Sequence, residues 1–360
     1  MVKSLKTATD VKELVTSFRY AEVLMTAFDM GIFAVISSNG PQTLDQLSEA
    51  SEAYPRSLAM LLNACVAMGL LNLTTDSKYD VTELSQSTLT PGSPHFLGNF
   101  IRLQRDVRLR WDRLRDGVEF NHRVNPERRN REDGSEWGWN HQFILGLHDA
   151  AREVAGPVAQ SLAPLLQRYN VKQMVDIGAG SGTYAAALVS AMPELNIRLY
   201  ELAGPLEITN ELLVNFPQRD RLELYPSNFQ TDPIGQEKEY DAAMLFGVLH
   251  SENKEGQTKL LGKISDALKP GGLLILRTPF LDPNRVSPSR ATLDALQTLI
   301  STNSGEVPTW QGLQKLLQEA GFGAGRIRHV PTTDIQLVYC TRRKSRAKRQ
   351  SAATPELCEV

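Results

Sequence analysis

Residues 174–188 read MVDIGAGSGTYAAAL, and this stretch decides the fold of the chain. An apolar run leads into a turn with glycine at positions 178, 180 and 182, and a helix-forming segment follows from Tyr184. A strand, a glycine-rich turn and a helix in this order present backbone N–H groups and a helix N-terminus to a ligand. Glycine is needed because a Cβ atom would hold the ligand away from the backbone. The stretch predicts an α/β sheet with a nucleotide-like ligand at this turn, and the alternative is an ordinary glycine-rich connection.

A carboxylate follows the next predicted strand, residues 197–200, at Glu201, 25 residues after Asp176. An acid at this distance suits two ribose hydroxyl groups. The dinucleotide fingerprint G-x-G-x-x-G fails, because the sixth position from Gly178 is Thr183. The pattern D-x-G-x-G-x-G resembles the first motif of class I S-adenosylmethionine (SAM) methyltransferases, in which the turn wraps the amino-acid end of SAM. The resemblance implies SAM as the cofactor and S-adenosylhomocysteine as its product.

Length and composition set wide bounds. At 360 residues, with 41% hydrophobic and 22% charged residues, the chain is typical of a two-domain globular protein. The net charge of −2 indicates no general attraction to nucleic acid or an anionic membrane. Three cysteines without paired spacing imply no disulfide framework, and no ligand set for a metal is present. The charged first twenty residues and the lack of an uncharged apolar run near ~18 residues lead us to expect a cytoplasmic protein.

The N-terminal region predicts a winged-helix arrangement. Helices are expected over residues 11–36, 44–50 and 56–68, and a strand pair around 70–73 and 79–82. A winged helix raises the question of DNA binding, but the third helix has one basic residue and is apolar nearly all round. A recognition helix needs several polar side chains for base edges and phosphates. The third helix therefore predicts packing against protein, with DNA binding as the weaker alternative.

An arginine-rich helix is predicted over residues 96–118. Aspartates alternate with the arginines, which favours a solvated face, and attraction of an acidic substrate is the alternative. A charged loop over 121–135 and a helix over 137–166 follow. The predicted division is a winged-helix domain (1–120), a charged loop and linking helix (121–170), a Rossmann-like SAM-binding catalytic domain (171–341) and a disordered basic tail (342–360).

From residue 171 onward, strands alternate with helices. This alternation is typical of a doubly wound α/β sheet built from βα units. The predicted strands are residues 172–177, 197–200, 222–225, 240–246, 272–278 and 334–341.

Together these segments resemble the family of small-molecule O-methyltransferases typified by plant caffeate O-methyltransferases and their bacterial natural-product relatives. The resemblance covers about residues 12–340. It implies a homodimer formed through the N-terminal domain, SAM bound by the C-terminal domain, and methylation of phenols or related acceptors in secondary metabolism. Besides the winged-helix start and the SAM turn, its motifs are Val248-Leu249-His250, Ala267-Leu268-Lys269-Pro270-Gly271-Gly272 and Glu319-Ala320-Gly321-Phe322.

The resemblance also assigns the cofactor contacts. Glu201 matches the ribose acid of the family. The adenine-side motif Gly-Asp-x-Phe is Pro226-Ser227-Asn228-Phe229 here, so its acid is missing and Ser227 or Asn228 is left to bond the adenine. The expected cofactor residues are Asp176, Gly178, Gly180, Gly182, Glu201, Leu202, Ser227, Asn228 and Phe229.

His250 matches the general base of the family, at the end of the fourth strand of the sheet. A neutral imidazole near pH 7 is suited to take the proton of a phenol as the methyl group moves. The family acids that support this histidine are replaced by Ser251, Thr278 and Val307, with Glu306 beside the last position. Without a carboxylate the imidazole loses tautomer control and basicity, so we expect activity to depend only weakly on His250.

The acceptor is expected in a mainly apolar pocket between the two domains. Its predicted walls are a helix that contacts substrate in the family, the strand before His250, and two threonines one helical turn apart. Phe246 shares a strand face with His250 if the strand extends to the histidine. Core packing is the alternative for the apolar residues, and a solvated helix face for the threonines. The expected acceptor residues are Phe143, Leu147, His148, Phe246, Thr298 and Thr302.

The sequence thus predicts a SAM-dependent methyltransferase that acts on the oxygen or carbon of a small aromatic or secondary-metabolite acceptor. The alternative is a family member that binds SAM without transferring methyl, such as a pericyclase, a decarboxylase, a hydroxylase or an inert paralogue. No metal, nucleic acid or membrane is expected to take part.

Overall fold

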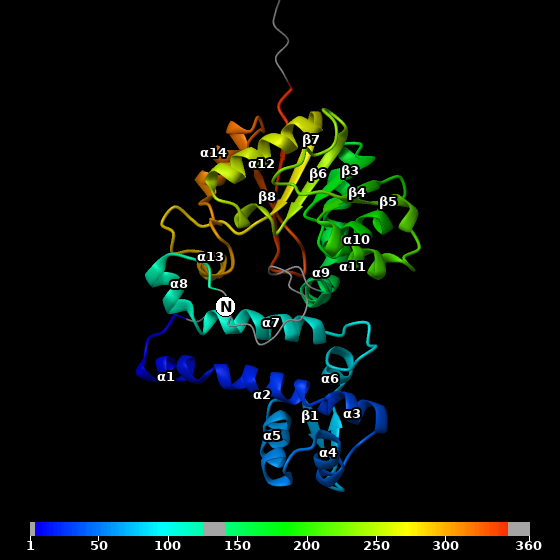
Figure 1. The fold of residues 1–360 in the computed structure, drawn as a ribbon, viewed down its shortest axis with the longest axis vertical. Coiled ribbons are helices and arrows are strands. Elements are labelled where there is room, and N and C mark those ends of the chain that lie inside the picture. The colour runs from blue at the N-terminus through cyan, green and yellow to red at the C-terminus, as the bar shows by residue number, and fades with distance from the viewer. Residues whose placement is uncertain (1–3, 125–140, 345–360) are drawn as a thin grey trace, which may run out of the picture.

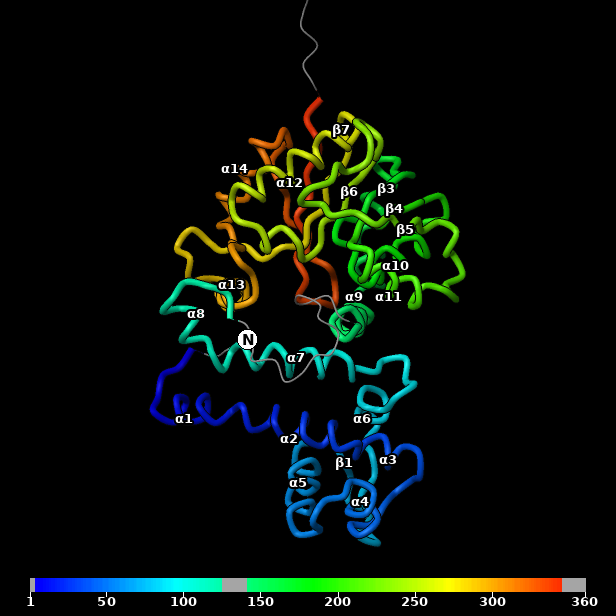
Figure 2. Tube along the Cα trace, viewed as in Figure 1, coloured from blue at the N-terminus to red at the C-terminus, as the bar shows by residue number. Residues whose placement is uncertain are grey.

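The computed structural model describes residues 4–124 and 141–344, which form an N-terminal helical domain and a C-terminal α/β domain (Figure 1, Figure 2). The predicted combination of a winged helix with a Rossmann-like domain is confirmed. Most of the charged loop predicted over residues 121–135 and the tail from residue 345 lie outside the described residues.

Three helices replace the single helix expected over residues 11–36. The first break lies at Ser17, whose hydroxyl donates to the carbonyl oxygen of Leu14 at 2.7 Å. The second lies at Gly31, whose φ of +73° is left-handed and ends the helix before it. The single-helix expectation is wrong because the apolar spacing continues across both breaks. The helices are α1 (Ala8–Thr16), α2 (Phe18–Asp29) and α3 (Ile32–Asn39).

The rest of the N-terminal domain follows the predicted winged-helix order. Thr43 caps α4 reciprocally: its hydroxyl accepts from the backbone N–H of Gln46, and the Gln46 side chain accepts from the backbone N–H of Thr43 at 2.8 Å. The third helix of the motif, α5, buries Leu58, Leu62 and Cys65 in the core, as a helix that packs on protein should. The elements are α4 (Leu44–Ser51), α5 (Pro55–Ala67), β1 (Leu71–Leu73), β2 (Tyr79–Val81) and α6 (Glu83–Thr88).

Two helices replace the helix expected over residues 96–118. The break lets the second of them lay Gly117 against the side chain of Ile300. Arg105 forms a 2.7 Å ion pair with an acid of α2, and Arg108 pairs with another. A solvated arginine face is therefore the wrong expectation for these two residues, because their charges join neighbouring helices. The two helices are α7 (Gly98–Trp111) and α8 (Leu114–Phe120).

A long helix, α9 (His141–Arg168), connects the two domains. It packs against α7 on one side and against α10 (Thr183–Ala191) on the other, as Figure 1 shows. Asp149, which is 2% exposed, accepts hydrogen bonds from the backbone N–H groups of Asn99 and Phe100 at 2.8 and 3.2 Å. A carboxylate at a helix N-terminus is stabilised by the helix dipole, so Asp149 anchors α7 to α9.

The described residues of the C-terminal domain form a seven-stranded sheet of order β5-β4-β3-β6-β7-β9-β8. The first five strands in this order are parallel, and β9 and β8 close the edge in antiparallel fashion. The predictions missed β8, because its sequence Arg-Ile-Arg-His carries no buried apolar run. The strands are β3 (Gln173–Ile177), β4 (Asn196–Glu201), β5 (Leu222–Pro226), β6 (Tyr240–Phe246), β7 (Leu268–Arg277), β8 (Arg326–His329) and β9 (Gln336–Thr341).

Helices cover both faces of this sheet, and the side chains of each strand alternate between two cores. Met174 of β3 joins the core beneath α9 and α10, whereas Val175 and Ile177 join the core beneath α12 and α14. The carboxyl ends of the parallel strands meet at one edge, where α13 also lies. The remaining helices are α11 (Ala203–Leu213), α12 (Lys254–Ala267), α13 (Ser289–Ser301) and α14 (Trp310–Glu319).

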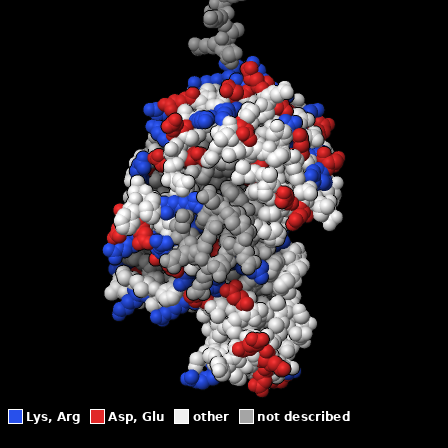
Figure 3. Space-filling view, in the orientation of Figure 1, with Lys and Arg blue, Asp and Glu red and all other residues white. Residues whose placement is uncertain are grey.

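The surface carries both charge signs. Lys and Arg side chains are interspersed with Asp and Glu over the visible face of the α/β domain (Figure 3). Within the described ranges, no single helix is long and apolar enough to cross a membrane. One bent pair of helices, Ala8–Asp29 with Ile32–Asn39, would be long and apolar enough, judged by length and composition only.

Gly182 is a position where the fold requires glycine. Its φ is +67°, and an added Cβ would lie 2.9 Å from Leu199 Cδ2. We expect Gly182→Ala to lower the free energy of unfolding by about 2–4 kcal/mol, from the left-handed backbone and the overpacked core. In α12, Gly262 has no atom within 4 Å of its built Cβ, so Gly262→Ala should stabilise the helix by up to about 1 kcal/mol. Urea denaturation measures both changes, and equal midpoints for the two variants would contradict the expectation.

Candidate functional site

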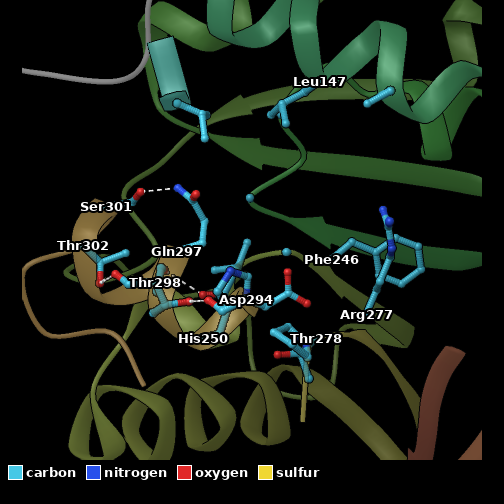
Figure 4. A pocket seen from close by; sticks show the side chains of 18 of the residues that line it. Leu147, Phe246, His250, Arg277, Thr278, Asp294, Gln297, Thr298, Ser301 and Thr302 are labelled. Atoms are coloured by element: carbon cyan, nitrogen blue, oxygen red, sulfur yellow. Dashed lines mark hydrogen bonds between the residues drawn. The ribbon is translucent and has the colours of Figure 1, made fainter. Parts of the chain in front are cut away.

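A cavity of about 2090 Å³ opens at the carboxyl edge of the parallel strands. The end of β4 and the loops after β3, β5, β6 and β7 form its floor, and α7, α9 and α13 form its other walls; Figure 4 shows part of it from close by. Ligands of open α/β sheets bind at this edge, because the loops there are free to differ while the strands hold their ends in place. The N-terminal half of the chain contributes α7, so both domains build the cavity.

The glycine turn forms one end of the cavity. Gly178 and Gly180 line it with φ values of +68° and +53°. An added Cβ at Gly178 would lie 2.4 Å from Val248 Cγ2, so this position admits no side chain. Gly182 is not a lining residue and packs against Leu199 instead. The turn therefore presents bare backbone to the cavity, as the sequence predicts.

Two buried carboxylates lie beside this turn, and their charges interact. Glu201 is 3% exposed and accepts from the backbone N–H groups of Gly180 at 3.1 Å and Leu202 at 2.8 Å. Asp176 is also 3% exposed, and its burial, together with the nearby charge of Glu201, raises its pKa to about 8. Burial raises the pKa of Glu201 as well. An acidic pair at the cavity wall suits a ligand that carries hydroxyl donors and positive charge.

Three cofactor residues were predicted in the loop after β5, and of these only Phe229 lines the cavity. Ser227 and Asn228 do not line it. They bond to Asp232 instead, which accepts from the backbone N–H of Asn228 at 2.8 Å and from the hydroxyl of Ser227 at 3.4 Å. Hydrogen bonds from this loop lower the pKa of Asp232. Asp232 thus holds the loop, and the sequence analysis missed it because it lies outside the motif. Leu202 does not line the cavity either.

His250 lies in a short 3-10 turn, Leu249–Ser251, and not at the end of a strand. β6 ends at Phe246, so the expectation that Phe246 and His250 share a strand face is wrong. Burial lowers the pKa of His250 to about 4, and its Nδ1 has no hydrogen-bond partner among the described residues. The imidazole is therefore neutral at physiological pH.

No carboxylate takes the place of the missing acids around His250 within the described ranges. The Thr278 hydroxyl is buried and lacks a hydrogen-bond partner there, and the Ser251 hydroxyl donates to the carbonyl oxygen of Val248 at 2.7 Å. Val307 is 4% exposed and packs in a small apolar cluster. Glu306 is exposed and does not line the cavity, so it does not substitute for them.

Five of the six predicted acceptor residues line the cavity. The sixth, His148, does not, and its Nδ1 lies 2.8 Å from the hydroxyl of Thr183. Thr298 donates to the backbone oxygen of Asp294, and Thr302 to that of Thr298, both at 2.8 Å, so α13 itself uses these hydroxyl groups. The five lining residues are Phe143, Leu147, Phe246, Thr298 and Thr302.

A series of side-chain hydrogen bonds that no sequence motif predicts joins α7 to α13 at the cavity wall. The Gln297 side chain accepts from the indole N–H of Trp111 at 2.5 Å. It donates to the hydroxyl of Ser301, also at 2.5 Å, as Figure 4 shows. Ser301 also accepts from Arg110 at 3.1 Å. No local motif marks these residues, because they meet only when the two domains pack. Groups of three His, Cys, Asp or Glu side chains that could hold a metal are absent from the part of the chain that is described.

Comparison with known proteins gives a consistent answer. A family model described as an O-methyltransferase domain matches residues 133–323, and an O-methyltransferase dimerisation domain matches residues 12–91. The tetracenomycin polyketide synthesis 8-O-methyl transferase of Streptomyces glaucescens is 26% identical, over 87% of this chain and 91% of that protein. The 3-hydroxy-5-methyl-1-naphthoate 3-O-methyltransferase of Streptomyces sahachiroi is 25% identical, over 81% of this chain and 82% of that protein.

A solved structure shares the fold. The human N-acetylserotonin methyltransferase, crystallised in complex with SAM, superposes with a TM-score of 0.81 at 22% identity, over 96% of this chain and all of that one. The methyltransferase model alone covers more than half of the sequence, and the dimerisation model covers most of the winged-helix region. This chain therefore belongs to the SAM-dependent O-methyltransferase family.

Proposed function

We propose that this enzyme transfers the methyl group of SAM to a hydroxyl oxygen of a small aromatic acceptor bound beside His250. The observation that carries the proposal is that one cavity contains both the glycine turn after β3 and His250 after β6. These two strands are neighbours in the sheet, so a cofactor at the turn and an acceptor at the histidine would meet. Holding both reactants in line supplies most of the rate enhancement for such a transfer.

The residues around the turn fit SAM. Gly178 and Gly180 leave room against the backbone, and the Glu201 carboxylate keeps acceptor capacity for ribose hydroxyls beyond its two backbone contacts. Asp176 adds an acidic group that a cationic ligand would hold ionised. When bound, SAM supplies an activated methyl group on a positively charged sulfur. The other predicted cofactor residues, Gly182, Leu202, Ser227 and Asn228, would act by shaping the turn and the loop after β5.

The acceptor end is aromatic and largely apolar. Phe143 and Leu147 from α9 and Phe246 from β6 form walls on which a flat ring would stack. Two relatives are named for a tetracenomycin and a hydroxynaphthoate acceptor, which supports a hydroxylated aromatic substrate. Burial keeps the His250 imidazole neutral, so it would accept the proton of the acceptor hydroxyl.

A second candidate is a protein that binds SAM without transferring its methyl group. It is favoured by one observation, namely that no carboxylate orients His250 within the described ranges. An acceptor that arrives already ionised would need no such support, so the same observation is compatible with methyl transfer.

Cofactor binding and product formation together test the proposed reaction. Wild-type enzyme should bind SAM and convert it to S-adenosylhomocysteine in a 1:1 ratio with methylated product when given hydroxylated aromatic acceptors. Gly180→Val should abolish binding of both SAM and S-adenosylhomocysteine in calorimetry, because its side chain would fill the turn. Gly262→Val adds the same side chain at an open helix position and should bind both normally. Retained SAM binding without any S-adenosylhomocysteine across the acceptor panel would favour the second candidate.

The pH dependence of turnover tests the role of His250. Protonation of the imidazole below its pKa of about 4 removes a base, so the rate should rise through about pH 4 and stay flat from pH 6 to 8. A base this weak contributes little, and we expect His250→Ala to cost roughly tenfold in turnover. His329→Ala, on the exposed β8, is the control. A rise through pH 6.5, or a loss of roughly 10²-fold or more, the usual contribution of a general base, would contradict a minor role for this base.

The first two helices of the N-terminal domain expose large apolar side chains, and we propose that these form the interface of a homodimer. α1 buries none of its residues, and Val15 and Phe18 are 66% and 52% exposed. Large apolar side chains grouped on one surface indicate a protein partner. Val15→Glu combined with Phe18→Glu should convert the dimer to monomer in analytical ultracentrifugation. Val214→Glu changes an equally exposed valine of the catalytic domain and should leave the mass unchanged, whereas a monomeric wild type would refute the proposal.

A further inference from the structure

Arg277 brings a cation to the cavity that no carboxylate of the described residues contacts. It ends β7 and lines the cavity, where Figure 4 shows it near Phe246. Its guanidinium donates to the hydroxyl of Tyr184 at 2.6 Å and lies 5.7 Å from the centre of that ring. Burial raises the pKa of Tyr184, so the phenol stays neutral at physiological pH and leaves the arginine charge uncompensated. We propose that Arg277 binds a carboxylate group of the methyl acceptor, an inference that rests on the proposed function.

The guanidinium is held in place before any ligand arrives. Tyr184, which fixes it, packs edge-to-face against Phe246, with ring centres 5.2 Å apart and planes at 79°. A guanidinium group has five N–H donors in a rigid fork that matches a carboxylate, and the bond to Tyr184 uses one of them. Arg277 and Phe246 therefore offer a charged group next to an aromatic wall, which suits an aromatic acid.

Asp294 of α13 is an acid of the cavity whose charge interacts with that of Arg277, and the two form no ion pair. Burial raises the pKa of Asp294, and the charges of Arg290 and Arg277 oppose that rise, so Asp294 lies within electrostatic range of Arg277 but beyond ion-pair distance. Arg290 itself pairs with Asp334 at the exposed rim. A ligand carboxylate would thus bind Arg277 without breaking an existing ion pair.

The order of the strands places Arg277 on the acceptor side. The turn, Glu201 and Phe229 follow β3, β4 and β5, whereas β7 lies beyond β6 in the opposite direction. The neighbours of Arg277 on that side are His250 and Thr278, which carry no charge at physiological pH. Asp294 is the group there that would oppose an anion, and burial raises its pKa, which disfavours its negative charge. Tyr184 belongs to the helix after the glycine turn, however, so the carboxylate of SAM itself is a second source of the same chemistry, which the experiment must separate.

The first arm of the test uses a matched pair of probes. Calorimetry at saturating S-adenosylhomocysteine compares 3-hydroxy-2-naphthoate with its neutral amide, 3-hydroxy-2-naphthamide. Wild type should bind the acid more tightly, and Arg277→Gln should weaken the acid roughly 10- to 100-fold while changing the amide less than about threefold. Arg277→Lys keeps the positive charge but lacks the forked donors, so its affinity for the acid should lie between those of wild type and Arg277→Gln. Arg326→Gln removes an equal charge from the exposed strand β8 and should change neither affinity.

The second arm tests the cofactor. S-adenosylhomocysteine carries a carboxylate, and 5′-methylthioadenosine lacks the whole amino-acid end, so both are titrated into wild type and Arg277→Gln. We expect equal affinities in the two proteins, and thermal melting verifies that the variant is folded. Weaker binding of S-adenosylhomocysteine alone, with the naphthoate unaffected, would assign Arg277 to the cofactor and overturn the proposal. Equal binding of acid and amide by wild type, or no binding of the acid, would also overturn the role proposed for Arg277. Methylation of neutral phenols would show in either case that the proposed function still holds.

Discussion

The hydrogen bond from the backbone N–H of Gly180 to the buried carboxylate of Glu201 ties the turn after β3 to the end of β4. A second backbone N–H, from Leu202, holds the other carboxylate oxygen. A carboxylate that is 3% exposed is tolerated only with such partners, so the turn and the acid stabilise each other. The positive φ of Gly180 brings its N–H to this position, which is why the turn needs glycine and why the cofactor end of the cavity is rigid.

The other walls of the cavity depend on how the N-terminal domain packs against the sheet. Asp149 of α9 holds the first turn of α7, and Gln297 of α13 accepts from Trp111 at the far end of the same helix. α7 is therefore fixed at one end by α9 and at the other by α13. α7 follows the dimerisation domain along the chain, so a helix of the N-terminal part forms one wall of the cavity.

The two sides of the cavity carry groups of different charge. Asp176 and Glu201 make the β3–β4 side acidic, which suits a cationic cofactor. On the β6–β7 side, a neutral imidazole and a threonine hydroxyl lie where acids would support a base, and an arginine lies beside them. An environment of this kind favours alignment of an anionic or readily ionised acceptor over strong base catalysis. In the proposed reaction, His250 would act on the reacting oxygen and Arg277 on the body of the acceptor.

The sequence by itself determined the two-domain order, the Rossmann-like sheet, the glycine turn and the acid at the end of β4, because these depend on contacts between residues close along the chain or on periodic apolar patterns. It failed at a local break, where the left-handed backbone of Gly31 ends a helix although the apolar spacing continues, and at β8, an edge strand whose charged residues hide it. Only the tertiary structure decided that His148 turns to Thr183, that Asp232 holds the loop after β5, and that Arg277 reaches the cavity. Side-chain direction at the ends of strands depends on neighbours from other elements, and no local pattern records which neighbours those are.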